Sequence, residues 1–326
     1  MKKQASEIGK EVIDLQIKSL KKLKNFINKS FEDAVELIVR CKSKVILSKV
    51  ILCGVGKSGI IASKISATLA SVGAPSFSIS ANDCSHGDLG RISNLDILIL
   101  ISYSGNTEEL KNIIKFAKQN KINLIAIVSN KRSILYKSAN IKLYIPEVEE
   151  SGLGIVPTSS TSSQLSLGDA LAISVMKKKK FGKLDFKRFH PAGNLANKLK
   201  TASDLMLTGK RIPVVKESET MKKALKVLNL KKLGFIVIIN NNGLNTGIFT
   251  DGDLKRLMQR KNFVPNLKIK SFMKKKPFTV EENTLATELL GQMNKRKITN
   301  VCVYNKNNKK RTIGVIHIHD LINVLK

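Results

Sequence analysis

Several residue types are scarce in this 326-residue chain, and each scarcity argues against a class of protein. Tryptophan is absent, and aromatic residues make up 5% of the chain. Because proteins that bind single-stranded nucleic acid stack bases on aromatic side chains, we expect no nucleic-acid partner. The four cysteines are Cys41, Cys53, Cys84 and Cys302. They lack the paired spacing of zinc sites and disulfide frameworks, so we expect reduced thiols and no metal.

Long apolar runs are also missing. No stretch approaches the ~20 apolar residues that span a bilayer. The N-terminal segment has no apolar core of the kind found in signal peptides. We therefore expect a cytoplasmic protein with no membrane partner.

Acidic residues are much less frequent than basic residues in this chain. Lysine and arginine total 57 against 25 aspartates and glutamates, which gives a formal net charge of +32. The lysines are spread over the whole length, and the basic runs are not interleaved with aromatic residues. We interpret this charge as a solvated surface that steers anionic ligands toward the protein.

Alternating strand and helix patterns predict the fold of the first 203 residues. Apolar strand patterns occupy residues 50–53, 76–80, 96–101, 122–128 and 141–145. Helical spacing occupies residues 9–42, 58–69, 108–119 and 160–176, with Ser30 as an N-cap because Asp33 follows three residues later. Continuous apolar strands separated by helices predict an α/β fold with a doubly wound, parallel five-stranded sheet.

An internal repeat begins near Thr201. Residues 247–254 (GIFTDGDL) match residues 314–321 (GVIHIHDL) at an offset of 67 residues, and Met206 and Met273 repeat at the same offset. Each half reads as helix, strand, turn, strand and helix, so we expect the two copies to pair. The predicted domains are 1–203, 204–262 and 263–326, the last two being small α+β modules.

Three turns rich in small residues follow predicted strands. They are Gly54-Val55-Gly56-Lys57-Ser58-Gly59, Ser102-Tyr103-Ser104-Gly105-Asn106-Thr107 and Pro157-Thr158-Ser159-Ser160-Thr161. Each places hydroxyls and free backbone N–H groups where a helix begins, which suits a phosphate. Because ligands of such sheets bind at the carboxyl ends of the strands, the sequence predicts a small phosphorylated ligand there.

The first of these turns also fits the dinucleotide fingerprint, which alone is a weak signal. Residues 76–81 contain no acidic residue to hold a ribose, and Asp83 lies beyond the strand. A Walker A loop is excluded, since position 51 is Ile51 instead of glycine. Lys57 is better interpreted as a cation at the edge of the sheet.

The second turn resembles the signature of sugar-isomerase (SIS) domains, and the repeat resembles a tandem pair of CBS modules. Further segments are Ser85-His86-Gly87-Asp88-Leu89-Gly90, Gly168-Asp169-Ala170-Leu171-Ala172 and His190-Pro191. Together these motifs resemble the D-arabinose 5-phosphate isomerase family over nearly the whole chain. The resemblance implies a flavodoxin-like SIS sheet followed by the CBS pair. It also implies interconversion of ribulose 5-phosphate and arabinose 5-phosphate, which supplies the lipopolysaccharide sugar Kdo.

The resemblance implies four catalytic positions. They are Lys57, Glu109 with Glu108 as the alternative, Glu149 with Glu150 as the alternative, and His190. An aldose–ketose isomerase needs a base beside the carbonyl and a group that stabilises oxyanion charge. His190 or a carboxylate suits the first role and Lys57 the second, and this chemistry requires no cofactor.

The remaining implied sites bind ligands. Substrate contacts are expected at Gly56, Ser58, His86, Ser102, Ser104, Gly105, Thr107, Ser159, Ser160 and Thr161. Thr250, Asp253 and Asp320 stand where CBS modules bind a nucleotide. His317 and His319 share one face of a strand, and we expect them to pack at the repeat interface, with a metal-binding pair as the alternative. The resemblance to SIS domains implies a site completed across a subunit interface, so a homo-oligomer is expected, either a dimer or, as we favour, a homotetramer.

Alternative functions remain open at this point. The chain could isomerise another sugar phosphate, such as an amino-hexose or a heptose phosphate. It could also be a non-catalytic sugar-phosphate sensor, although a sensor would need only the phosphate turns. An NAD-dependent oxidoreductase is a more distant alternative.

Overall fold

The computed structural model describes residues 4–40, 48–259 and 266–325, which divide into two compact units, Met1–Phe186 and Lys187–Lys326. Cys53, Cys84 and Cys302 are buried free thiols, whereas Cys41 lies outside the described residues. Burial raises the pKa of Cys53 and of Cys302 to about 12. The domain limits 1–203, 204–262 and 263–326 stay a proposal.

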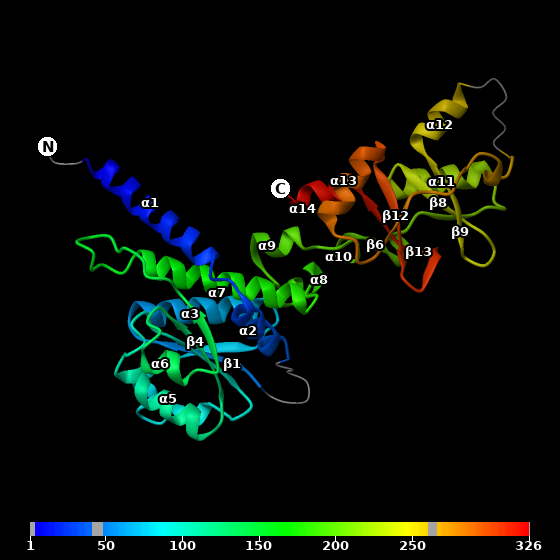
Figure 1. Ribbon diagram of the computed structural model, residues 1–326. Coiled ribbons are helices and arrows are strands. Elements are labelled where there is room, and N and C mark those ends of the chain that lie inside the picture. Colours follow the sequence, from blue (N-terminus) through cyan, green and yellow to red (C-terminus); the bar gives the residue numbers. More distant parts are fainter. Residues whose placement is uncertain (1–3, 41–47, 260–265, 326) are drawn as a thin grey trace. The chain divides into compact units, whose positions relative to one another are not determined.

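A parallel five-stranded sheet forms the centre of the first unit (Figure 1). Its strands are β1 (Val50–Gly54), β2 (Ser76–Ser80), β3 (Ile97–Ile101), β4 (Asn123–Val128) and β5 (Ile141–Tyr144). The spatial order is β2-β1-β3-β4-β5, which confirms the predicted doubly wound sheet. Because the chain crosses to the other side of β1 when it enters β3, the carboxyl ends of these two strands form the topological switch point.

Both faces of this sheet are covered. Val50 and Leu52 of β1 face one hydrophobic cluster, whereas Ile51 and Cys53 face the other. The first cluster lies under α1 (Ala5–Lys24), α2 (Lys29–Arg40), α3 (Lys57–Ser71) and α7 (Ser159–Lys178). The second lies under α4 (Ala81–Cys84), α5 (Glu109–Gln119) and α6 (Ile134–Ser138) (Figure 1). Burial on both faces explains why the strands read as continuous apolar runs.

Two local predictions were wrong. Ser30 lies inside α2, and its backbone N–H donates to Asn28 Oδ1 at 3.0 Å, so Asn28 caps the helix instead. Asp96 precedes β3 because its buried carboxylate accepts hydrogen bonds from the backbone N–H groups of Lys49 and Ser93, each at 2.8 Å. These bonds hold Asp96 in the turn that enters the strand.

The second unit contains two four-stranded sheets with helices at their ends. One sheet has the order β10-β9-β8-β7, with β7 (Val214–Lys216), β8 (Phe235–Ile239), β9 (Asn245–Thr250) and β10 (Lys274–Lys275). The other has the order β11-β12-β13-β6, with β6 (Leu207–Thr208), β11 (Thr279–Glu281), β12 (Asn300–Asn305) and β13 (Asn308–His317). The helices of the second unit are α8 (Lys183–Phe189, which begins in the first unit), α9 (Gly193–Lys198), α10 (Ala202–Leu205), α11 (Met221–Lys231), α12 (Asp251–Met258), α13 (Ala286–Arg296) and α14 (Ile318–Leu325).

The two repeats exchange their first strands. The short strand β6 is the first strand of the first repeat but pairs with β13 of the second, with Thr208 opposite Gly314. Likewise β10 is the first strand of the second repeat and pairs with β9 of the first, with Lys275 opposite Gly247. The two residue pairs are equivalent, because Thr208 and Lys275 are separated by 67 residues, as are Gly247 and Gly314. The predicted pairing of the copies therefore includes an exchange of strands.

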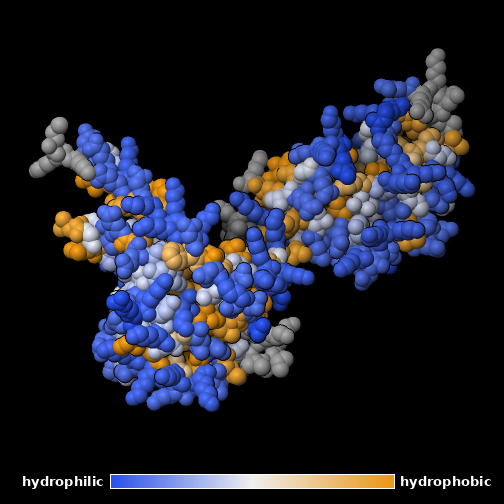
Figure 2. Space-filling view, in the orientation of Figure 1, coloured by the Kyte–Doolittle hydropathy of each residue, from blue (hydrophilic) through white to orange (hydrophobic). Residues whose placement is uncertain are grey.

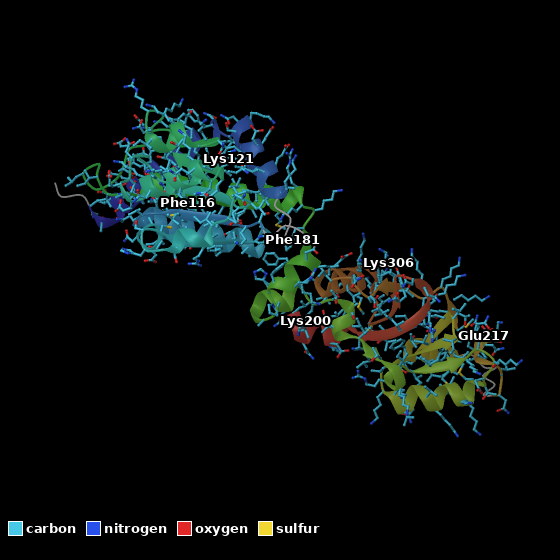
Figure 3. All side chains as sticks on the ribbon, turned by 90° about the horizontal axis from the view of Figure 1, so that it is seen from below. Phe116, Lys121, Phe181, Lys200, Glu217 and Lys306 are labelled. Carbon is cyan, nitrogen blue, oxygen red and sulfur yellow. The ribbon has the colours of Figure 1, made fainter. Side chains whose placement is uncertain are left out.

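The lysine-rich composition is visible on the surface of each unit. Exposed lysines include Lys121, next to α5, and Lys306, in the turn between β12 and β13 (Figure 3). This distribution agrees with the interpretation of the charge as a solvated surface.

Candidate active site

A pocket of about 360 Å³ lies at the switch point of the first unit. Its wall combines the turn after β1, the turn after β3 and the first turns of α7. The lining residues are Val55, Lys57, Ser58, Tyr103, Glu150, Ile155, Pro157, Ser160, Thr161 and Gln164. Of the predicted site residues, the pocket brings together Lys57, Ser58, Ser160 and Thr161, as well as the alternative glutamate, Glu150.

The turn after β1 is shaped by two glycines. Gly56 has φ +57°, a conformation that glycine adopts without strain, and α3 begins at the next residue. A Cβ on Gly54 would lie 2.8 Å from the backbone of Ser58, so the end of β1 and the start of α3 can approach only because Gly54 has no side chain. This close turn places Lys57 and Ser58 in the first turn of α3, facing the pocket.

Ser58 joins the start of α3 to α7. Its hydroxyl donates to Gln164 Oε1 at 3.2 Å, and Gln164 is only 1% exposed. Lys57 is exposed and forms no ion pair within the described part of the chain. The geometry therefore fixes Ser58 and leaves the Lys57 ammonium able to meet an anionic or polarised oxygen.

Glu150 occupies the N-terminus of α7. Its carboxylate accepts hydrogen bonds from the backbone N–H groups of Thr158 and Ser159, both at 2.8 Å, and of Ser160 at 3.3 Å. Burial alone would raise the pKa of the Glu150 carboxyl, but hydrogen bonds from Ser160 and Thr158 outweigh burial and hold this pKa below its usual range. A carboxylate whose pKa is lowered and the lysine Lys57 therefore line the same pocket.

Glu149, the glutamate preferred from the sequence, is exposed and is not among the residues that line the pocket. Glu109 is exposed at the start of α5, and the neighbouring Glu108 pairs with Lys111 at 2.5 Å. His86 is exposed after α4. His190 belongs to the second unit, between α8 and α9, where its backbone N–H donates to Lys187 at 3.2 Å.

The turn after β3 is organised by its own hydroxyls. Ser102 Oγ lies 2.8 Å from Thr107 Oγ1 and accepts from the backbone N–H of Gly105 at 3.0 Å. Gly105 has φ +70°, and a Cβ there would lie 2.7 Å from Val128. Ser104 is exposed, and its hydroxyl accepts from Asn106 N–H at a longer 3.4 Å. These hydroxyls form a compact turn, of which Tyr103 reaches the pocket wall.

Sequence reasoning missed several lining residues. Tyr103 stands between the two serines of its turn, and Gln164 follows Ser160 by four residues on the same face of α7. That helical spacing was a usable signal for Gln164. Val55 and Pro157 belong to two of the predicted turns but were not named as site residues, and no local pattern pointed to Ile155.

The predicted nucleotide residues of the second unit are engaged within the protein. Asp253 is 8% exposed, accepts hydrogen bonds from the backbone and hydroxyl of Thr250, and forms ion pairs with Arg256 and Lys274. Burial would raise the pKa of Asp253, but hydrogen bonds from Lys274, Thr250 and Arg256 lower it to about 2. In the second repeat, Asp320 accepts from the backbone of His317 at 3.3 Å.

His317 and His319 pack against each other, with ring centroids 4.9 Å apart, and His317 Nδ1 accepts from the backbone of His319. Within residues 4–40, 48–259 and 266–325, no three His, Cys, Asp or Glu side chains are grouped to hold a metal ion. In the same ranges, no helix is both long and apolar enough to cross a membrane.

Comparison with known proteins covers both units. The SIS domain model matches residues 47–174, and the CBS domain model matches residues 202–260 and 269–326. Arabinose 5-phosphate isomerase KdsD of Francisella tularensis is 39% identical over 317 residues, covering 96% of this chain and 94% of that protein. The enzyme of the same name from Escherichia coli K12 is 38% identical over 318 residues, covering 97% and 94%.

A solved structure is similar to part of the chain. An Escherichia coli CFT073 protein in complex with A5P is 33% identical, with a TM-score of 0.52. The match covers 58% of this chain and 100% of that one. Since the identity to the two KdsD enzymes extends over nearly the full length of each protein, this chain belongs to the arabinose 5-phosphate isomerase family, with a SIS domain followed by two CBS domains.

Proposed function

We propose that this protein interconverts D-ribulose 5-phosphate and D-arabinose 5-phosphate. The observation that carries the proposal is the switch-point pocket, where Lys57 and Glu150 line one cavity with the hydroxyls of Ser160 and Thr161. The choice of substrate follows from membership of the arabinose 5-phosphate isomerase family. A sensor would need the hydroxyls alone, whereas a carboxylate and an ammonium in one pocket suit proton transfer and oxyanion stabilisation.

The proposed reaction moves a proton between neighbouring carbons. From the ketose, a base removes a proton from C1, the C2 carbonyl oxygen takes up negative charge, and an enediolate forms. The base then returns the proton to C2 while the proton of the O1 hydroxyl passes to O2, which leaves an aldehyde at C1 and a hydroxyl at C2. We assign stabilisation of the oxyanion to Lys57. Glu150 and His190 are the candidates for the base, and we favour Glu150 over Glu149 because Glu150 lines the pocket.

We place the substrate phosphate at the turn after β3. The backbone N–H groups at the start of α7 are already bonded to Glu150, so this helix N-terminus is occupied by a carboxylate. The turn formed by Ser102, Ser104, Gly105 and Thr107 offers hydroxyls and an exposed Ser104. Ser160 and Thr161 then contact the sugar hydroxyls, and we keep Gly56, Ser159, His86 and Glu109 as further candidate substrate contacts.

The test is direct. Purified protein is incubated with ribulose 5-phosphate, and arabinose 5-phosphate is measured; in D₂O, solvent deuterium should enter the product at the carbon that is reprotonated. If the protein turns over an amino-hexose phosphate or a heptose phosphate but not ribulose 5-phosphate, the proposed substrate is wrong and that sugar phosphate is the substrate instead. Binding without turnover of any sugar phosphate would support the sensor.

We further propose that the enzyme is a cytoplasmic homotetramer that supplies Kdo for lipopolysaccharide. Apolar side chains are exposed on α1, with Ile8 and Ile13 about half exposed, and in the loop 151–156, where Leu153 is 96% and Ile155 75% exposed. Figure 2 shows apolar surface along α1 and at the tip of this loop. A second copy of the chain would cover such surfaces. Light scattering after size-exclusion chromatography measures the mass, and a monomer would contradict the proposal.

A nucleotide bound to the CBS pair is the last proposed partner. Asp253 already accepts from Thr250, Arg256 and Lys274, so a ribose hydroxyl must displace one of these donors. Calorimetric titration of the full chain with adenine and cytidine nucleotides tests this proposal, and Asp253→Ala should abolish any binding that is seen.

A further inference from the structure

Tyr103 connects two parts of the pocket that are distant in sequence. Its ring packs against the hydrophobic cluster under α7 and lines the pocket. Its hydroxyl accepts a hydrogen bond from the backbone N–H of Val148 at 3.0 Å, across 45 residues of sequence. Its own carbonyl accepts from Ser129 N–H at 3.0 Å, so the tyrosine is anchored to the end of β4.

Val148 belongs to the irregular segment that carries Glu150 from β5 to α7. This segment leaves the sheet after Ile145, whose N–H donates to the Val128 carbonyl at 2.9 Å. At its other end, Ser151 N–H donates to Thr158 Oγ1 at 3.0 Å. Between these two points, Tyr103 supplies the hydrogen bond that holds the backbone two residues before Glu150.

We propose that Tyr103 is a positioning residue that holds Glu150 in the pocket, a role that rests on the proposed isomerase function. The Glu150 carboxylate must lie at a set distance from the reacting carbon, and small displacements of a catalytic group reduce turnover strongly. The segment that carries Glu150 has no strand or helix of its own to fix this position. The start of α7 holds the Glu150 carboxylate, and the hydroxyl of Tyr103 adds a constraint on the backbone that leads to it, while the Tyr103 ring forms part of the pocket wall.

The experiment compares Tyr103→Phe, which removes one oxygen and keeps the ring, with Tyr136→Phe as a matched control. Tyr136 is half-buried against the other face of the sheet and does not line the pocket. On ribulose 5-phosphate we expect kcat of Tyr103→Phe to fall roughly tenfold with KM within about twofold of wild type. Tyr136→Phe should match wild type in both parameters.

A double-mutant cycle with Glu150→Gln separates positioning from general stability. If Tyr103 acts through Glu150, Tyr103→Phe should change kcat by less than about twofold once the carboxylate is gone. An equal tenfold loss in both backgrounds would overturn the proposal. A raised KM with unchanged kcat would overturn it too, because the hydroxyl would then contact the substrate itself.

Hydrogen exchange gives a readout that does not depend on activity. The Val148 amide should be protected in wild type and exchange faster in Tyr103→Phe, with no change in Tyr136→Phe. If wild type has no isomerase activity but Val148 loses protection, the proposed function fails while the constraint on the Glu150 segment stands. Unchanged protection of Val148 in Tyr103→Phe overturns the positioning role whatever the activity.

Discussion

Met206 occupies the space where a side chain on Gly314 would lie. A Cβ on Gly314 would be 2.8 Å from the Cβ of Met206 and closer still to its thioether, although the two residues are more than 100 positions apart. At the equivalent position of the other repeat, a Cβ on Gly247 would lie 2.7 Å from Met273 Sδ. These paired contacts explain why methionine and glycine recur together at the 67-residue offset: each methionine precedes an exchanged strand and packs over the glycine opposite it.

We predict that Gly314→Ala lowers the free energy of unfolding of the second unit by about 1–3 kcal/mol, because the added methyl group overpacks a filled site. Urea denaturation followed by circular dichroism measures the change. Gly291→Ala is the control. Gly291 lies in α13, and a Cβ on it would have no other heavy atom within 4 Å. Alanine at this position should therefore raise the free energy of unfolding by roughly 0.5–1 kcal/mol. Equal effects at the two glycines would contradict the packing argument.

For the phosphate site, we predict that Ser104→Ala raises KM for ribulose 5-phosphate roughly tenfold, the usual effect of losing one hydrogen bond to a charged group. Ser104 is exposed in the turn after β3, so the loss should leave the melting temperature unchanged. Ser203→Ala, at an exposed serine of the second unit, serves as the control in steady-state kinetics. If Ser104→Ala leaves both KM and kcat unchanged, the phosphate binds elsewhere.

The two adjacent glutamates give a sharper test. We predict that Glu150→Gln lowers kcat by ~10²–10⁴-fold, as for a general acid–base group, whereas Glu149→Gln at the exposed neighbour has no effect. Because the Glu150 pKa is lowered, its carboxylate stays ionised below the usual carboxyl range, and activity should fall only as pH drops through this lowered pKa. If Glu149→Gln lowers kcat and Glu150→Gln does not, the acid–base role belongs to Glu149.

The ion pairs of Asp253 predict an acid-sensitive second unit. Its folded pKa of about 2 lies below the ordinary value of 3.8, so its stabilisation is complete above pH ~4 and is lost as pH falls through 2. The shift corresponds to at most about 2 kcal/mol, since the Lys274 and Arg256 side chains are more than half exposed and water screens them. Asp253→Asn should remove this pH dependence from chemical denaturation curves, while Asp251→Asn, at an exposed position of the same helix, should retain it.

The sequence predicted those features that short-range patterns determine. Continuous apolar runs such as 97–101 identified the strands because both faces of the sheet are buried, and the turns after the strands placed Lys57 and Ser160 at one edge. The choice between Glu149 and Glu150 depended on an irregular segment, where no period tells which side chain faces inward. The role of Tyr103 depends on a hydrogen bond across 45 residues. The exchanged strands β6 and β10 are two residues long, too short to show a pattern.

The last prediction concerns the division of labour between the units. A chain ending at Thr201 should still isomerise ribulose 5-phosphate within roughly tenfold of the full chain, because the pocket lies wholly within the first unit. Residues 187–201 should lose protection from hydrogen exchange in the shortened chain, because the cut removes Leu285, the β-bridge partner of Thr201 within the second unit.

A second cut at Phe186 tests His190 at the same time. If His190 transfers a proton, the chain ending at Phe186 and full-length His190→Ala should both lose ~10²–10⁴-fold in kcat, while the chain ending at Thr201 does not. Circular dichroism and light scattering must show that each shortened chain is folded and has the oligomeric state of the full chain. A chain ending at Thr201 that is folded, oligomeric and inactive would mean that the CBS pair supplies part of the site. Equal activity of both shortened chains would instead leave the proton transfer to Glu150.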